Sequence, residues 1–300
     1  MWMYLGLIAA LFYGLHNLCK KHAVNGNEAI PVLLGTISTG FLFFVPWYLL
    51  SVFAPSTAQE FNVYIPEISW QYHGFIFIKS AIMTGSWILA YQALKHLPIT
   101  IVTPIRAAGP FFTLLGALFI YHETPNALQW IGFLVILISM LVYSKVGQIE
   151  GINFRKNRWI FAIIGATFLG SSSGLYDKFL VQHLNLSPQT LQFWFCFYVV
   201  LLLVIVLAFI WFPYAEKRKK FQFRWSIIGV GILLQAADYF YFKALQSPEA
   251  MIMLLSAIKR SQILIAVIAG GIIFKEKNKR KKLVPLMGVL TGVALILYAK

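Results

Sequence analysis

Residues 105–123 read IRAAGPFFTLLGALFIYHE, and residues 258–276 read IKRSQILIAVIAGGIIFKE. Each stretch is apolar but carries a cation near its start and a glutamate seventeen residues later, Arg106 with Glu123 and Lys259 with Glu276. Both members of the first pair recur 153 positions further along. A pattern that recurs at one offset predicts a tandem repeat. Ionisable residues inside apolar segments are costly in a bilayer and usually face a solute, so the repeat favours a carrier.

The composition around these stretches is that of a membrane protein. Hydrophobic residues make up 59% of the 300 and charged residues only 12%, and the mean hydropathy is +0.74. A soluble domain of this composition would expose much of its apolar surface to water. The first apolar run lacks the basic start and the small-residue cleavage site of a secretory signal, so we expect a retained transmembrane helix.

The chain lacks the motifs of several enzyme classes. The six histidines form no H-x-x-x-H or H-E-x-x-H pair, so we predict no metal site. Cys19 and Cys196 lie in apolar segments, where free cysteines are usually buried. Without a G-x-x-x-x-G-K-[ST] loop, nucleotide hydrolysis is not expected, and transport should be secondary or facilitated with no cofactor.

Ten apolar segments are each long enough to cross a core of ~30 Å at 1.5 Å per residue. The odd-numbered connections between them hold 18 of the 25 Lys and Arg residues. The positive-inside rule therefore places these connections in the cytoplasm and both termini outside, and we expect a multi-pass protein of a bacterial plasma membrane. The net charge of +15 then reflects topology and not a nucleic-acid partner. The segments are 3–20, 30–53, 73–94, 99–121, 127–145, 159–178, 188–213, 225–245, 250–274 and 283–299.

The ten segments divide into two sets of five. Because five is odd, two homologous halves must enter the membrane in opposite directions. The predicted fold is therefore an all-α integral membrane protein with ten transmembrane helices in two inverted five-helix repeats. The repeats would be residues 1–145 and 159–300, joined by a cytoplasmic linker at 146–158. Inverted repeats commonly expose a site at their interface alternately, as one half rocks against the other.

A glutamate closes the fourth segment of each half before a glycine-containing fifth segment, Glu123 before Gly132 and Glu276 before Gly288. With the helix count and the two halves, this pattern resembles the drug/metabolite transporter superfamily. The usual member of that superfamily has ten helices in two EamA-type repeats. The resemblance covers the whole chain and implies a carrier.

Three shorter motifs look like the triose-phosphate translocator branch of that superfamily. Residues 105–112, IRAAGPFF, are similar to its K-A-L-E-P-F-F, and residues 257–260, AIKR, are similar to its V-L-K-R. In the first segment, Asn17 with Lys20 and Lys21 is similar to its N-x-x-N-K-K.

In that branch, the fourth-helix lysine and the ninth-helix Lys-Arg pair hold the phosphate of the substrate. The resemblance implies the same role for Arg106, Lys259 and Arg260. This chain has arginine in place of lysine at 106 and Gly109 in place of the branch's glutamate.

The depth of these cations bears on the same role. Arg106 lies about 12 Å into the fourth segment, where its long side chain can either serve the site or snorkel to the interface. Lys259 and Arg260 lie about 15 Å deep and point about 100° apart, so they need anionic partners or a wet cavity. Asp238, in the eighth segment, either neutralises one of them in the empty carrier or titrates in a proton-linked cycle.

Other ionisable residues have simpler expected roles. Lys79 and Lys243 are expected to snorkel towards the outer face. Asp177 and Lys178 are expected to pair locally at the outer end of the sixth segment. A cap or a gate is expected of the helix-end glutamates 123 and 276, and Lys20 is a candidate ligand at the cytoplasmic end of the first segment.

Aromatic residues occupy equivalent positions in the two halves, in the third and eighth segments. They suit either packing against lipid or the wall of a cavity, and the sequence leaves both open. The predicted substrate-binding residues are Arg106, Lys259, Arg260, Asp238, Tyr91, Tyr239, Tyr241, Trp87 and Lys20.

Three functions stay open at the level of the sequence. The first is a secondary transporter of a small organic anion or zwitterion by alternating access, with coupling either to protons or to a counter-substrate. The second is an exporter of amino acids or hydrophobic cations. The third is a membrane enzyme acting on lipid-linked phosphate, which is disfavoured because no carboxylate or histidine pair is spaced for acid-base work at depth.

Overall fold

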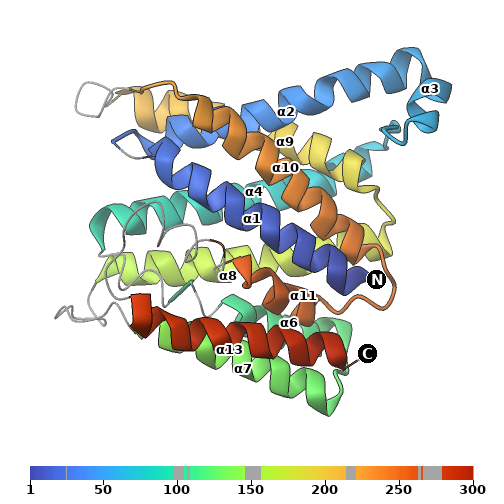
Figure 1. The fold of residues 1–300 in the computed structure, drawn as a ribbon. Helices are drawn as coiled ribbons and strands as arrows, with labels where there is room; N and C mark the ends of the chain where they lie inside the picture. Colours follow the sequence, from blue (N-terminus) through green and yellow to red (C-terminus); the bar gives the residue numbers. More distant parts are fainter. Residues whose placement is uncertain are drawn as a thin grey trace.

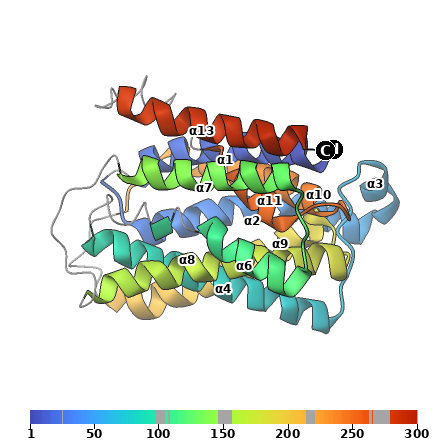
Figure 2. The same ribbon diagram turned by 90° about the horizontal axis from the view of Figure 1, so that it is seen from below.

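The computed structural model describes residues 1–24, 26–97, 105–106, 109–145, 157–213, 221–262, 265 and 279–299. Within these residues all regular structure is helical, and the long helices lie roughly side by side (Figure 1). Both termini and the short helix α3 lie at the same end of the bundle (Figure 2). The elements are α1 (Trp2–Val24), α2 (Ala29–Phe53), α3 (Pro55–Glu60), α4 (Trp70–His96), α6 (Gly109–Tyr121), α7 (Ala127–Lys145), α8 (Arg158–Lys178), the π-helical turn η1 (Phe179–His183), α9 (Pro188–Val206), the π-helical turn η2 (Leu207–Trp211), α10 (Trp225–Leu245), α11 (Ile252–Lys259) and α13 (Lys279–Tyr298).

Six helical segments in the described residues are long and apolar enough to cross a membrane. They correspond to six of the ten predicted segments, and α7 and α13 correspond to the fifth and tenth. The fourth and ninth predicted segments, 99–121 and 250–274, extend beyond the described residues. Their described parts are mainly α6 and α11, both shorter than a full span.

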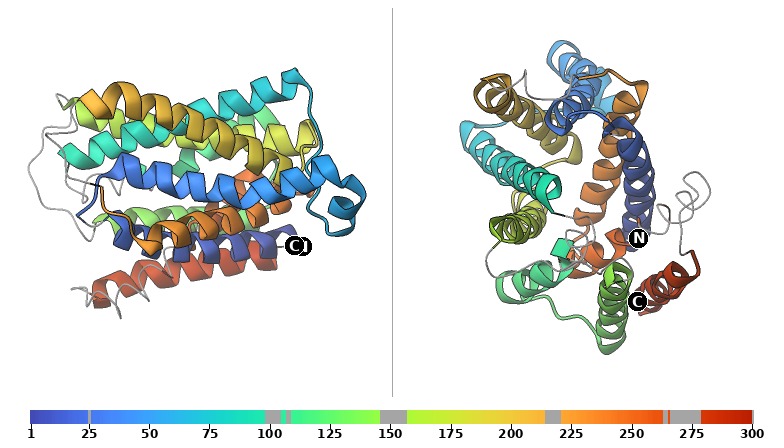
Figure 3. Two further views of the ribbon diagram at one scale, coloured as in Figure 1. Left: turned by 90° about the horizontal axis from the view of Figure 1, so that it is seen from above. Right: turned by 90° about the vertical axis from the view of Figure 1, so that its left-hand side faces the viewer.

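The packing interleaves the two predicted halves. Helix α1 packs against α10, α4 against α8, α2 against α9 and α7 against α13, so each pair takes one helix from either side of residue 150. Viewed from one end (Figure 3, right), α7 and α13 lie together at one side of the bundle, and α2 and α9 lie at the other. The walls of any central cavity therefore come from both parts of the chain.

Glycines allow α7 and α13 to approach closely. A Cβ atom on Gly132 would lie 2.7 Å from the carbonyl oxygen of Gly292, and a Cβ on Gly292 would lie 2.7 Å from that of Gly132. Small residues at such a crossing let two helix backbones come into contact. Gly132 is the glycine that the sequence placed in the fifth helix of the first repeat.

The sixth helical segment is longer than the sequence predicts. Helix α8 continues through η1 to His183, five residues beyond the predicted end at Lys178. Asp177 and Lys178 are consequently buried inside the bundle, with exposed fractions of 6% and 8%. The prediction that they pair with each other at an interface is wrong, because Asp177 pairs with Lys79 on α4 and Lys178 pairs with Glu123 in the connection after α6.

Candidate functional site

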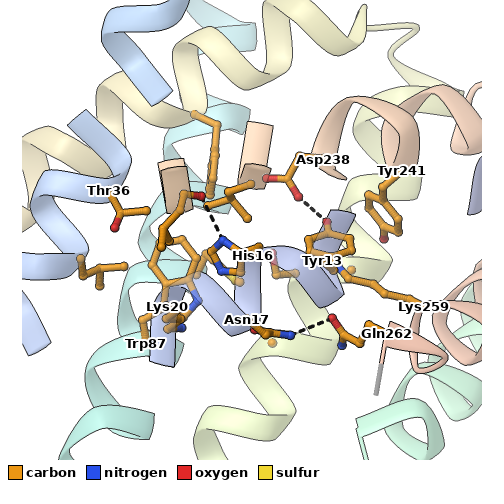
Figure 4. Close-up of a pocket in the computed structure, with 18 of the residues that line it drawn as sticks. Tyr13, His16, Asn17, Lys20, Thr36, Trp87, Asp238, Tyr241, Lys259 and Gln262 are labelled. Atoms are coloured by element: carbon orange, nitrogen blue, oxygen red, sulfur yellow. Dashed lines mark hydrogen bonds between the residues drawn. The ribbon is translucent and has the colours of Figure 1, made fainter. Parts of the chain in front are cut away.

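Two adjoining cavities lie in the middle of the bundle. The first has a volume of about 230 Å³ and is walled mainly by α1, α2, α4, α8 and α10 (Figure 4). The second has a volume of about 200 Å³ and extends towards α6 and α11. They are neighbours because seven residues line both: Met83, Arg106, Gly170, Gly174, Tyr241, Lys259 and Gln262.

The break at the end of α11 carries the two predicted cations of the second half. The helix ends at Lys259, and Arg260 and Ser261 form a turn. The Lys259 ammonium faces two aromatic rings, 4.0 Å from the ring centre of Tyr13 and 4.5 Å from that of Tyr241. Within the described residues, no carboxylate lies within 4 Å of it. Cation–π contacts therefore hold this ammonium in place of an ion pair.

Arg260 points to the start of α6. A Cβ atom on Gly109 would lie only 2.6 Å from its Nη2 atom, so the guanidinium occupies the space that a side chain at 109 would fill. The Ser171 hydroxyl donates a hydrogen bond of 2.9 Å to the Gly109 carbonyl. Arg260 and Ser171 both line the second cavity. This contact supplies a physical reason for glycine at position 109.

Asp238 does not pair directly with the cations predicted to be its partners. The Tyr13 hydroxyl donates a hydrogen bond to Asp238 Oδ1, while the ring of Tyr13 faces Lys259 (Figure 4). Tyr13 therefore bridges the carboxylate and the ammonium. All three residues line the first cavity, so the predicted grouping of Asp238 with Lys259 is present through an intermediate that the sequence did not identify.

Lys79 and Asp177 form an ion pair in the wall of the first cavity. The exposed fraction of Lys79 is 3%, so the prediction that it snorkels to the outer face is wrong. The ammonium also lies 4.7 Å from the ring centre of Phe195 and 5.4 Å from that of Phe242. The helix α4 turns Lys79 towards α8 and α9, where a carboxylate and aromatic rings compensate for the loss of water.

Glu123 forms a cap between helices. Its Oε1 atom accepts hydrogen bonds from Lys178 Nζ at 2.7 Å and from the Ile252 backbone N–H at 2.6 Å. Its Oε2 atom accepts one from the Met253 N–H at 3.1 Å. A carboxylate at a helix N-terminus satisfies free N–H groups and the helix dipole. The predicted capping role of Glu123 fits these contacts, while Glu276 lies outside the described residues.

The remaining predicted residues divide between the cavities and the periphery. Trp87 and Lys20 line the first cavity, and Tyr241 and Arg106 line both cavities. Tyr239 lies instead in a separate apolar pocket with Phe43, Trp47 and Phe240. Nothing is described of the Tyr91 side chain.

Of the α1 residues that line the first cavity, the sequence predicted Lys20 as a ligand but not Tyr13, His16 or Asn17. His16 Nδ1 lies 3.0 Å from the Val230 carbonyl oxygen, and the Asn17 amide donates to Gln262 at 3.2 Å (Figure 4). A spacing of three or four residues along α1 places all four on one helical face, and this polar stripe is the signal that could have found the other three.

Cations outnumber carboxylates around the cavities. Among the described lining residues the carboxylates are Asp177 and Asp238, and the cations are Lys20, Lys79, Arg106, Lys259 and Arg260. A cavity of this charge favours a negatively charged solute. Within the described residues, no three His, Cys, Asp or Glu side chains lie together as a metal ion would require.

Comparisons with known proteins agree with this architecture. The model of the EamA-like transporter family matches residues 1–145 and 157–298. A solved structure described only as the crystal structure of a protein aligns with a TM-score of 0.73 and 13% sequence identity. That alignment covers 99% of this chain and 97% of the other, and at this identity it shows the fold alone. No curated protein matches the sequence.

Proposed function

Because the chain belongs to the EamA-like transporter family, we propose that it moves a small organic anion or zwitterion across the membrane as a secondary transporter. The observation that carries this proposal is the position of Lys259 and Arg260. Both face the central cavities, and neither makes an ion pair with a carboxylate of the described residues. Both cations are half-buried. Cations partly withdrawn from water without a counter-ion are costly, and an anionic substrate would supply that counter-ion.

Alternating access is supported by the way the helices pair. Under the predicted repeat, α1 corresponds to α8 and α4 corresponds to α10. The repeat therefore relates the α1–α10 contact to the α8–α4 contact, and both contacts are present, as an inverted repeat requires. In Figure 1, α1 and α8 also run in opposite directions. The cavity would open to each side in turn as these pairs move apart at either end.

The direction of opening in this conformation follows from the polar contacts. At the end where both termini lie, Glu123 joins Lys178 and the start of α11, and Gln182 donates to the carbonyls of Leu245 and Ser247. Towards the other end, Asn17 and Arg106 are exposed while lining the cavity. We therefore infer that the cavity opens at the end opposite the termini.

That open end is the cytoplasmic one in the proposed topology. Helix α1 ends there, and α8, α10 and α13 begin there (Figure 1). Basic residues mark these helix ends, namely Lys20, Arg158, Arg224 and Lys279. By the positive-inside rule this end faces the cytoplasm, and the termini lie outside.

A specific observation favours the second candidate, an exporter of amino acids or hydrophobic cations. Asp177 and Asp238 both line the first cavity, together with the aromatic rings of Tyr13, Trp87 and Tyr241. Carboxylates and aromatic faces are what a cationic group prefers. Both carboxylates already have partners inside the protein, so we rank this candidate below the anion carrier.

The substrate class can be tested by ligand stabilisation followed by transport. Purified protein is screened by thermal shift against sugar phosphates, carboxylates, nucleotides and amino acids. A ligand at 100 times its dissociation constant adds about 2.7 kcal/mol to the free energy of unfolding. Each ligand found is then measured for uptake into proteoliposomes.

We expect the double variant Lys259→Met, Arg260→Gln to lose uptake of the anion, because the substrate's charge would have no counter-ion. Lys243→Met is the matched control, since Lys243 lies on α10 but is exposed and lines neither cavity. Unchanged anion uptake by the double variant would reject this site. If the wild type takes up a cation and the double variant takes it up equally well, this result would instead support the exporter.

A further inference from the structure

Two carboxylates line the central cavities among the described residues, and both contact groups of the protein itself. Asp238 accepts a hydrogen bond from the neutral hydroxyl of Tyr13. Asp177 is paired with a full positive charge, the ammonium of Lys79. The two acids therefore differ in their partners. A neutral phenol hydroxyl donates to Asp238, whereas an ammonium group neutralises Asp177.

The surroundings of the Lys79 ammonium are those of a cation-binding site. It lies 4.7 Å from the ring centre of Phe195 on α9 and 5.4 Å from that of Phe242 on α10, beside the Asp177 carboxylate. An acid combined with aromatic faces is the arrangement that recognises organic ammonium groups. Here the occupant is a side chain of the protein, which reaches the site from α4 and is 3% exposed.

We propose that Lys79 is a specificity-determining residue, an internal cation that occupies the carboxylate and aromatic rings of the cavity and so excludes cationic substrates. This rests on the proposed function, because it explains how a transporter with two acids in its site still selects anions. With Asp177 neutralised by Lys79, the other charged residues among the described lining are the cations Lys20, Arg106, Lys259 and Arg260 and the carboxylate Asp238, so cations dominate the cavities.

A purely structural role for the pair predicts something different. Buried ion pairs contribute little net stability compared with apolar residues of similar volume, so a pair kept only for packing could be replaced as a unit without consequence for selectivity. A pair kept for selectivity predicts different effects for removal of one partner and removal of both. Removal of Lys79 alone leaves a cation site, whereas removal of both partners leaves none.

The test is a gain of binding in the variant Lys79→Ala. The probe is tetramethylammonium chloride, which is permanently charged and compact, and sodium chloride holds the ionic strength constant. Binding of radiolabelled probe to the purified full-length protein is measured by scintillation proximity. We expect Lys79→Ala to bind it at least about tenfold more tightly than the wild type. The double variant Lys79→Ala, Asp177→Asn should lose that gain.

Lys243→Ala is the matched control, because it removes an exposed lysine from α10 and should bind the probe no better than the wild type does. A folded Lys79→Ala protein without the gain would overturn the proposal, as would an equal gain in the double variant. If Lys79→Ala does not yield a monodisperse protein, Lys79→Gln replaces it; that variant keeps most of the side-chain volume and leaves Asp177 without a counter-charge.

The outcome is separable from that of the proposed function. Wild-type protein that transports no anion, with variants that gain tetramethylammonium binding, would reject the anion carrier but keep the role of Lys79. Anion uptake by the wild type, with no gain in a folded Lys79 variant, would reject only the role of Lys79.

Discussion

Gly109 offers a test of the proposed role of Arg260 in substrate binding. A Cβ atom there would meet Arg260 Nη2 at 2.6 Å, so Gly109→Ala must displace the guanidinium. We expect about tenfold weaker binding of the anion found by ligand screening, or about 1.4 kcal/mol. Gly85→Ala is the control, because its Cβ would lie 3.8 Å from Leu169 in ordinary contact. Isothermal titration calorimetry of both variants measures their affinity for the anion. Equal affinities would mean that Arg260 does not bind the anion.

At the scale of residues, the sequence predicted which charged side chains line the cavities better than it predicted the contacts that those side chains make. The depth of Lys259 and Arg260 followed from counting residues, and both line the cavities. Lys79 was assigned to the outer face because depth alone does not say which way a side chain points, and its partner Asp177 lies 98 positions away. Tyr13 was missed for a similar reason: an aromatic residue in an apolar helix is usually a packing residue, and only the fold brings it between Asp238 and Lys259.

At the scale of elements, Glu123 fixes the position of α11 and with it that of Lys259 at the other end of the helix. Glu123→Ala would remove the acceptor for the Ile252 and Met253 N–H groups and leave the Lys178 ammonium buried without its carboxylate. We expect the free energy of unfolding in detergent to fall by about 3 kcal/mol, measured by denaturant titration.

Two further variants bear on the same prediction. Lys178→Met added to Glu123→Ala should restore part of the loss, because the unpaired charge is removed while the cap stays absent. Glu249→Ala, at an exposed glutamate shortly before α11, should have little effect. A loss equal to that of Glu249→Ala would show that the cap does not hold α11.

Helix boundaries show why the elements were only partly predictable. The hydropathy of residues 250–274 favours one continuous helix, but α11 ends at Lys259, where Arg260 and Ser261 turn. Hydropathy sums over residues and carries no information on a break between them. In the sixth segment, the charge of Lys178 predicts a position at the interface, but Glu123 on another part of the chain compensates this charge inside the bundle.

At the scale of the whole molecule, the moving bodies should not be the two halves of the sequence. The repeat suggested that residues 1–145 rock against residues 159–300, yet α1 is packed along α10 and α4 along α8. Each of these contacts joins the two halves and would have to break if the halves separated. Separation between the α1–α10 pair and the α4–α8 pair keeps both contacts and changes access to the cavity that lies between them.

Reversible cross-links can distinguish these two movements. His22 on α1 and Ser226 on α10 lie within one proposed body, with Nδ1 and Oγ 3.1 Å apart. Gln182, at the end of α8, and Ser247, just after α10, join the two bodies where the termini lie, with Gln182 Nε2 2.8 Å from the Ser247 carbonyl oxygen. Double cysteine variants of each pair, in a background without Cys19 and Cys196, are linked by a short bifunctional methanethiosulfonate. We expect the Gln182–Ser247 link to stop uptake until it is reduced, because that end can no longer open. The His22–Ser226 link should leave uptake in place, whereas if the sequence halves were the moving bodies it would block transport as well, since it also joins them.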